Sequence, residues 1–200
     1  MSEDVARSNV VVERPCIALD LDSTLAKTSD VAFDLLCGPG HDYTYKDIES
    51  WSWGFDEFGK AAYLNALWHA WTLRRDDITP TETDISQTTS QLREYAAQLD
   101  VVTAHPQDGL LGVDENKQQW LDDWNIHYDE YHSVSGDKHE LEYDIYIDDS
   151  PKTAEEVAQR DDATLYLYNQ PYNQDVTGDY VRVNTIHEVM ADLLVNRELA

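Results

Sequence analysis

Short apolar runs alternate along this chain with longer segments in which apolar residues recur at helical spacing. The run at 16–19 has the length and hydrophobic character of a buried strand. Further strands are predicted at 100–104, 128–134, 143–147 and 164–168. Helices are predicted at 30–37, 56–73, 84–99, 115–125 and 185–195, with one more that has Pro151 in its first turn. Strands alternating with helices predict an α/β fold, a three-layer sandwich whose mostly parallel central sheet is covered on both faces.

Polar side chains follow three of the predicted strands at their carboxyl ends. Asp20 and Asp22 come after the first strand, Thr103 lies at the end of the second, and Asp148 and Asp149 come after the fourth. In open α/β sheets, ligands bind outside the carboxyl ends of the strands, so we expect these side chains to converge. Acids brought together repel one another unless a cation lies among them, and oxygen ligands beside a phosphate favour Mg²⁺.

Such an arrangement suits phosphoryl transfer. A carboxylate that a cation orients can attack phosphorus and form a phosphoaspartate. A second acid two residues further along an extended segment points the same way, so Asp20 and Asp22 can reach the same phosphate. The second acid can protonate the leaving oxygen and later activate water. The phosphoryl oxygens also need positive or N–H partners, which a lysine, a hydroxyl and backbone amides can supply.

Four motifs, in order, resemble those of the haloacid dehalogenase (HAD) superfamily of phosphatases. Asp20-Leu21-Asp22-Ser23-Thr24 resembles the first motif, Asp-x-Asp-x-Thr, and Val101-Val102-Thr103-Ala104 resembles the second, a hydrophobic strand ending in Ser or Thr. Lys138 fits the lysine of the third motif, and residues 147–151 fit the fourth, acidic motif. The match covers nearly the whole chain from Pro15 onward and implies a Rossmann-like central sheet.

The resemblance implies a role for each matching residue. Asp20 would be the nucleophile and a Mg²⁺ ligand, and Asp22 would be the general acid and base, with its backbone carbonyl on the metal. Asp148 would ligate Mg²⁺ directly, and Asp149 would support it. The implied phosphate-binding residues are Thr24, Thr103, Ala104 and Lys138; Lys138 would also orient Asp20 and Thr24 would steady the loop.

A finer resemblance is to the 5′-nucleotidase branch that includes the 5′(3′)-deoxyribonucleotidases. It rests on Asp137-Lys138, on residues 147–151 and on Asn169-Gln170-Pro171-Tyr172-Asn173, while residues 43–48 with Trp51 fit the small helical cap of that branch. The implied domains are a polar N-terminal segment at 1–14, a core at 15–29 and 81–200, and a cap insertion at 30–80. The implied substrate is a small phosphorylated molecule, a nucleoside monophosphate whose base could stack on cap aromatics.

Several residues and functions have competing interpretations. Trp51, Trp53 and His105 are candidates for substrate contact, although packing is the commoner role of such tryptophans. A calcium-binding EF-hand loop starting at Asp20 is excluded, because Leu25 stands where that loop needs Gly. Two other functions stay open: the same chemistry on a sugar phosphate or another small metabolite, and a catalytically silent acidic binding protein that keeps the fold.

Charge changes the expected environment of the protein. Forty Asp and Glu stand against fourteen Lys and Arg, which gives a formal net charge of −26, and the acids are spread along the whole chain. Such a surface repels itself, and salt screens the repulsion as the Debye length falls to ~3 Å at 1 M. We interpret the sequence as halophilic, with an ordinary acidic protein as the alternative. The acidity also argues against nucleic acid as a partner.

The remaining sequence signals concern location. Cys16 and Cys37 are too few for a disulfide framework and form no metal-ligand pair by spacing. Residues 1–9 lack the apolar run of a signal peptide, and no stretch approaches the ~20 apolar residues of a membrane span. We therefore expect a cytoplasmic protein with no membrane partner. The sequence leaves the number of chains in the assembly open.

Overall fold

A computed structural model describes residues 14–104, 112–135 and 137–199. Its centre is one sheet of six strands in the order β3-β2-β1-β4-β5-β6, and every neighbouring pair is parallel. The strands are β1 (Cys16–Leu19), β2 (Gln98–Ala104), β3 (Tyr131–Val134), β4 (Ile145–Asp148), β5 (Thr164–Tyr168) and β6 (Val181–Val183). The predicted parallel α/β sheet is therefore confirmed. The order places β1 between β2 and β4, so the ends of these three strands lie side by side.

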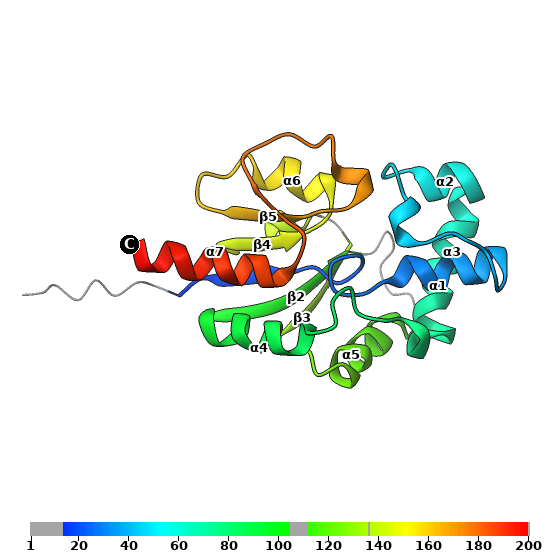
Figure 1. Ribbon diagram of the computed structural model, residues 1–200, viewed down its shortest axis with the longest axis horizontal. Coiled ribbons are helices and arrows are strands. Elements are labelled where there is room, and N and C mark those ends of the chain that lie inside the picture. The colour runs from blue at the N-terminus through cyan, green and yellow to red at the C-terminus, as the bar shows by residue number, and fades with distance from the viewer. Residues whose placement is uncertain (1–13, 105–111, 136, 200) are drawn as a thin grey trace, which may run out of the picture.

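Seven α-helices surround or adjoin the sheet in the described part of the chain (Figure 1). They are α1 (Thr28–Cys37), α2 (Trp53–Phe58), α3 (Lys60–Leu73), α4 (Ile85–Tyr95), α5 (Val113–Asp123), α6 (Pro151–Val157) and α7 (Ile186–Leu199). Leu92 of α4, Trp120 of α5 and Val189 of α7 share a buried cluster with Ile17 and Leu19 of β1. On the opposite face, α6 packs its Ala154 and Val157 on Ala18, Tyr146 and Leu165. These two clusters make the predicted three layers.

Helices α1, α2 and α3 stand together beyond the carboxyl ends of the strands, at the right of Figure 1. Residues 28–73 are called the helical group below. Its small core consists of Phe33, Ile48 and Tyr63, which aromatic side chains of the same segment surround. The chain enters and leaves the helical group at adjacent points, because Ala26 forms an antiparallel bridge with Pro80 and the Lys27 N–H donates to the Thr79 carbonyl at 3.0 Å. The predicted boundaries of a cap domain at 30–80 stay a prediction.

Several predicted boundaries are wrong, for identifiable reasons. The segment 56–73 contains two helices, because Gly59 at φ 82° interrupts it. The helix predicted at 84–99 ends at Tyr95, and Leu99 belongs to β2, where it pairs with Ile17. Leu92 and Leu99 are seven residues apart, so the apolar spacing also fits a helix. The strand β6 was not predicted; it has only three residues at the edge of the sheet.

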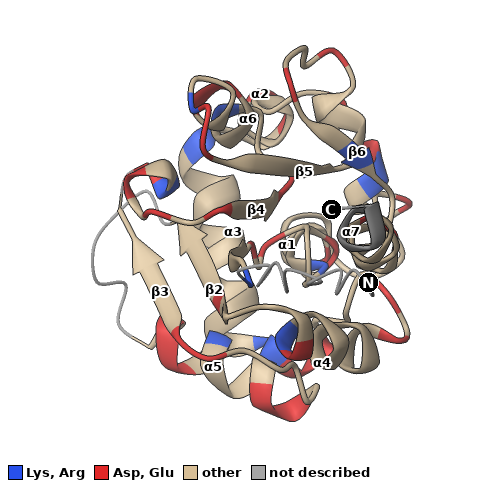
Figure 2. Cartoon of the chain, turned by 90° about the vertical axis from the view of Figure 1, so that its left-hand side faces the viewer, with Lys and Arg blue, Asp and Glu red and all other residues tan. Residues whose placement is uncertain are grey.

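Asp and Glu positions occur in helices and loops around the outline of the chain in the view of Figure 2. Lys and Arg are few and scattered among them in the same view. The distribution agrees with the pattern along the sequence. In the described residues, no helix combines the length and the apolar character that crossing a membrane requires.

Candidate active site

Three carboxylates converge at the carboxyl ends of β1 and β4. Asp20, Asp148 and Asp149 are almost completely buried, and each offers an oxygen within 4.8 Å of the oxygens of the other two. The ammonium of Lys138, also buried, donates to Asp20 and, at 2.7 Å, to Oδ2 of Asp148. Lys138 begins a short 3₁₀ helix (Lys138–Glu140) just before β4. One cation thus faces three acids, and all four side chains are almost completely buried.

The electrostatics of this group follow from burial and from the imbalance of charge. Burial raises the pKa of Asp20 to about 6, with Lys138 opposing the rise and Asp148 adding to it. Burial and then the charges of Asp20 and Asp148 raise the pKa of Asp149 well above its ordinary value. Burial alone would lower the pKa of Lys138, but the two carboxylates it contacts raise the pKa instead. The group therefore contains more acidic groups than the single Lys138 ammonium can balance.

A divalent cation fits that deficit. The three acids present only oxygen atoms, which are the ligands that hard cations such as Mg²⁺ prefer. Each carboxylate that coordinates a cation is stabilised in its ionised form, so the binding of metal would lower the pKa values that burial has raised. Asp20, Asp148 and Asp149 are the residues that would hold it.

Asp22 lies beside this group in a separate set of contacts. Its Oδ1 accepts from Thr28 Oγ1 at 2.6 Å and from Trp71 Nε1 at 2.9 Å, and its Oδ2 accepts from Lys117 Nζ at 2.5 Å. Burial opposes ionisation of Asp22, but the charge and hydrogen bond of Lys117, with the hydrogen bonds of Thr28 and Trp71, hold the pKa below its ordinary value. Lys117 thus favours the ionised form of Asp22.

Thr103 belongs to the same set of contacts as Asp22 and Lys117. It is buried at the end of β2, and its Oγ1 accepts from Lys117 Nζ at 2.9 Å and lies 3.4 Å from Oδ2 of Asp22. Ala104, the last residue of β2, is exposed. The sequence placed Thr103 and Asp22 at one edge of the sheet, and the structure brings them into contact. His105, predicted as a substrate contact, lies outside the described residues.

The loop after β1 is held in a tight turn. Ser23 has φ 68°, in the left-handed region, and its N–H donates to the Ala26 carbonyl at 2.8 Å. Thr24 is buried, and its Oγ1 donates to Oδ1 of Asp149 at 3.1 Å. Thr24 therefore joins the loop that carries Asp20 to the loop that carries Asp149.

A third segment, 170–173, supports the site from the end of β5. Tyr172 donates its hydroxyl to Oδ2 of Asp149, and Asn173 donates to the Asp149 carbonyl at 2.9 Å. Gln170 donates its side-chain amide to the Ser23 carbonyl at 2.6 Å. Burial and the charge of Asp149 raise the pKa of Tyr172 well above its ordinary value. The segment keeps both acidic loops in place.

The two predicted tryptophans have different surroundings. Trp51 is 58% exposed and contacts Tyr172 edge to face, with ring centroids 5.6 Å apart. Trp53 packs within the helical group, where its ring meets those of Phe33 and Phe58 at 5.6 and 5.8 Å. Through Tyr172, Trp51 is connected to the acidic group; Trp53 belongs to the packing of the helices.

Sequence reasoning missed Lys117. This lysine is 1% exposed, and its Nζ lies 5.3 Å from the centre of the Trp71 ring besides contacting Asp22 and Thr103. A signal for it exists in retrospect: Lys117 lies three residues before Trp120 on α5, so both share one helix face. Trp120 is buried and donates to the Ile78 carbonyl at 2.9 Å. A lysine on the buried face of a helix in so acidic a chain indicates a paired charge.

Comparisons with known proteins agree with this geometry. Residues 14–199 match the model of the family described as 5′ nucleotidase, deoxy (pyrimidine), cytosolic type C protein. No curated protein matches the chain.

Among solved structures, a Clostridium difficile protein assigned as a phosphatase is similar at a TM-score of 0.56 and 11% identity, over 92% of this chain and 99% of the other. A HAD phosphatase from Thermococcus onnurineus is similar at a TM-score of 0.48 and 13% identity, over 89% and 97% of the two chains. The first likeness shows the shared fold. The family match covers almost the whole described chain, and with the ordered motifs it makes the chain a HAD-type phosphatase of the nucleotidase branch. The chain belongs to the 5′ nucleotidase, deoxy (pyrimidine), cytosolic type C family.

Proposed function

We propose that this protein is a Mg²⁺-dependent phosphomonoester hydrolase that works through an aspartyl phosphate on Asp20 and acts on nucleoside monophosphates. The observation that carries the mechanism is the buried group of Asp20, Asp148 and Asp149 with a single lysine. Bound Mg²⁺ would supply positive charge for the transferred phosphoryl oxygens and for the attacking carboxylate.

In the first step, a carboxylate oxygen of Asp20 attacks phosphorus and the ester P–O bond breaks. Lys138 orients Asp20 through the ion pair that it makes in the free protein. Thr103 and Lys117 lie on the side of Asp22, where a hydroxyl and an ammonium can bind phosphoryl oxygens. The leaving alkoxide takes a proton from Asp22.

Asp22 must acquire that proton, although Lys117 keeps it ionised in the free protein. A bound phosphate dianion competes with Asp22 for the Lys117 ammonium. As Lys117 turns to the phosphate, Asp22 loses the interaction that holds its pKa down, and it can accept a proton from solvent. The binding of substrate thus prepares the acid.

In the second step, water attacks the phosphoaspartate and the bond between Asp20 and phosphorus breaks. Asp22, now ionised, accepts a proton from the attacking water. Inorganic phosphate leaves, Lys117 pairs with Asp22 again, and Asp22 releases its proton to solvent, so that both carboxylates return to their initial state. The same residue thus acts as acid and then as base, which requires its pKa to respond to the phosphate.

The proposed substrate class rests on the family and on the position of Trp51. The family description names deoxy and pyrimidine nucleotides. Trp51 is exposed and contacts Tyr172, which bonds Asp149, so a base stacked on Trp51 would lie near the phosphate site. A cytoplasmic location and adaptation to high salt are also part of the proposal; the description of the family as cytosolic and the charge of −26 support them.

The test is phosphate release from deoxy- and ribonucleoside monophosphates, sugar phosphates and an aryl phosphate, measured in molar KCl with Mg²⁺ or EDTA. We expect release that requires Mg²⁺, favours nucleotides and disappears in Asp20→Asn. A phosphorylated protein trapped at short times, and absent from Asp20→Asn, would demonstrate the intermediate. Preference for a sugar phosphate would keep the mechanism and refute the substrate class; no release from folded protein would refute both.

A further inference from the structure

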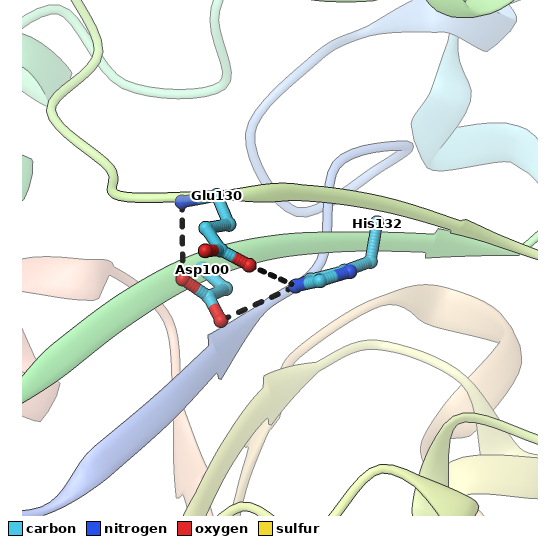
Figure 3. Close-up of side chains that lie close together, drawn as sticks. All are labelled: Asp100, Glu130 and His132. Carbon is cyan, nitrogen blue, oxygen red and sulfur yellow. Dashed lines mark hydrogen bonds and ion pairs between the residues drawn. The ribbon is translucent and has the colours of Figure 1, made fainter.

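A second group of potential metal ligands lies at strands β2 and β3, away from the acids of the active site. Figure 3 shows Asp100 of β2 with Glu130, the residue directly before the neighbouring edge strand β3, and His132 of β3. Their side chains offer two carboxylate oxygens and an imidazole nitrogen within 4.8 Å of one another. Asp100 is three residues before Thr103, so the group is roughly 10 Å along the strand from the active site.

Asp100 is a completely buried carboxylate whose hydrogen-bond donors are neutral. Its Oδ2 accepts from the Tyr143 hydroxyl at 2.6 Å and the Gln98 amide at 2.7 Å, and its Oδ1 accepts from the Glu130 N–H at 3.1 Å. In the described residues, no lysine or arginine pairs with it. Hydrogen bonds from neutral donors stabilise a buried carboxylate, and a cation beside it stabilises it further. A bound metal ion would supply that positive charge.

The position of His132 favours a metal ion. Its Nε2 lies 3.4 Å from Oδ2 of Asp100 and 3.5 Å from Oε2 of Glu130. Charge-assisted N–H···O bonds are shorter, about 2.7–2.9 Å. Two ligands of one tetrahedral Zn²⁺ are about 3.3–3.5 Å apart, given metal–ligand bonds of about 2.0–2.2 Å. The imidazole therefore lies at the spacing of a co-ligand of both carboxylates.

A comparison within the chain shows what distinguishes this group. Asp137, His139 and Glu156 also lie within 4.8 Å of one another. There, however, the ammonium of Lys152 pairs with Asp137 and, at 3.5 Å, with Glu156. The lysine already supplies the positive charge. The group on β2 and β3 has no such lysine among the described residues.

We propose that Asp100, Glu130 and His132 bind a divalent transition-metal ion, Zn²⁺ by its geometry, with water completing the coordination. An imidazole beside two carboxylates suits Zn²⁺ better than Mg²⁺, which prefers oxygen ligands alone. Tyr143 and Gln98 orient the Asp100 carboxylate from outside the coordination sphere. His132 and Glu130 are partly exposed, so the ion enters from solvent. The ion ties the edge strand β3 to β2 and has no part in phosphoryl transfer.

The test uses the full chain after treatment with EDTA, in molar KCl and excess Mg²⁺ to occupy the active site. Zn²⁺ binding is measured by competition with a chromophoric chelator, and Co²⁺ binding by visible absorption, which is strong for four-coordinate Co²⁺. We expect about one Zn²⁺ to bind per chain. At free Zn²⁺ about 100-fold above Kd, we expect Tm to rise by about 5–10 °C. His132→Asn and Glu130→Gln should weaken binding by about 100-fold or more and remove the rise in Tm.

Two control variants locate the site. His139→Asn, in the group that contains Lys152, should bind Zn²⁺ like the wild type, and so should Asp148→Asn in the active site. Loss of binding in Asp148→Asn with retention in His132→Asn would overturn the proposal, as would the absence of a Zn²⁺-dependent rise in Tm. A third result would also overturn the proposal. If Tm changed with pH in the wild type but not in His132→Asn, and Zn²⁺ had no effect on either protein, a protonated imidazole would be what balances Asp100.

Discussion

Lys117 Nζ and Asp22 Oδ2 are 2.5 Å apart, although their residues are separated by 95 positions in the chain. This ion pair joins α5 to the loop after β1 and places a second ammonium in the site, opposite Lys138. The two lysines serve different acids: Lys138 contacts Asp20 and Asp148, while Lys117 contacts Asp22. The proposed nucleophile and the proposed proton donor thus pair with different lysines.

Replacing Lys117 should change both rate and pH dependence. We expect Lys117→Met to lower kcat by about 10²-fold or more, as the loss of a charged partner for the phosphoryl oxygens does elsewhere. Lys117 holds the pKa of Asp22 below its ordinary value, so its removal raises that pKa. The limb of the pH–rate profile that reflects ionisation of Asp22 should then move to higher pH. Lys152→Met, at an exposed lysine, is the control; an unshifted profile in Lys117→Met would contradict the pairing.

Removal of the Tyr172 hydroxyl should weaken metal binding. Tyr172→Phe leaves an oxygen of Asp149 without the hydrogen bond that supports it. Loss of an outer partner of a ligating carboxylate costs about 10–100-fold in metal affinity. The Mg²⁺ concentration for half-maximal activity should rise by that factor, with little change in kcat at saturating Mg²⁺. A fall in kcat that Mg²⁺ does not restore would indicate a different role.

The two tryptophans should give opposite phenotypes. Trp51→Ala should raise KM for nucleotides about tenfold or more, because a stacked base contributes about 1–3 kcal/mol, and it should leave KM for an aryl phosphate nearly unchanged. Its stability should change by less than about 0.5 kcal/mol. Trp53→Ala should instead destabilise the protein by roughly 3 kcal/mol. Substrate panels and denaturant unfolding of both variants provide the comparison, and the reverse pattern would refute the assignment.

Salt should stabilise the fold. The charge of −26 is spread over the surface, and the Debye length falls from ~10 Å at 0.1 M to ~3 Å at 1 M. Tm should rise over this range; a gain of ~2 kcal/mol corresponds to about 4–8 °C for a chain of this size. The triple variant Glu115→Gln, Asp175→Asn, Asp179→Asn, at exposed acids, should show a smaller rise. A Tm that does not depend on KCl would exclude halophily.

The sequence predicts the strands better than the ends of the helices. An apolar run followed by an acid indicates a buried strand and its carboxyl end at once, which is why Asp20 and Asp148 could be placed together. The end of α4 could not be placed, because Leu99 fits the helical period as well as the strand that pairs with Ile17. Tertiary pairing decides between the two.

Contacts between distant residues are the part that a single sequence does not reveal. The acids follow apolar strands, so their convergence can be predicted from topology. The contacts of Lys117 and Tyr172 cannot be predicted in this way. The local sequence patterns of α5 and of residues 170–173 do not indicate which acid each side chain contacts. Sequence alone also could not show that Trp51 and Trp53 have different environments. Tertiary packing leaves Trp51 exposed and surrounds Trp53 with aromatic rings.

The bridge between Ala26 and Pro80 bears on how such a protein can change in evolution. More than fifty residues depart from the core and return to nearly the same point, so their length adds little strain to the strands on either side. Insertions, deletions or exchange of this excursion would leave the register of β1 with β2 and β4 intact. New substrates could therefore be acquired by rewriting one contiguous stretch of the gene, provided that Thr28 and Trp71, which bond Asp22, are kept.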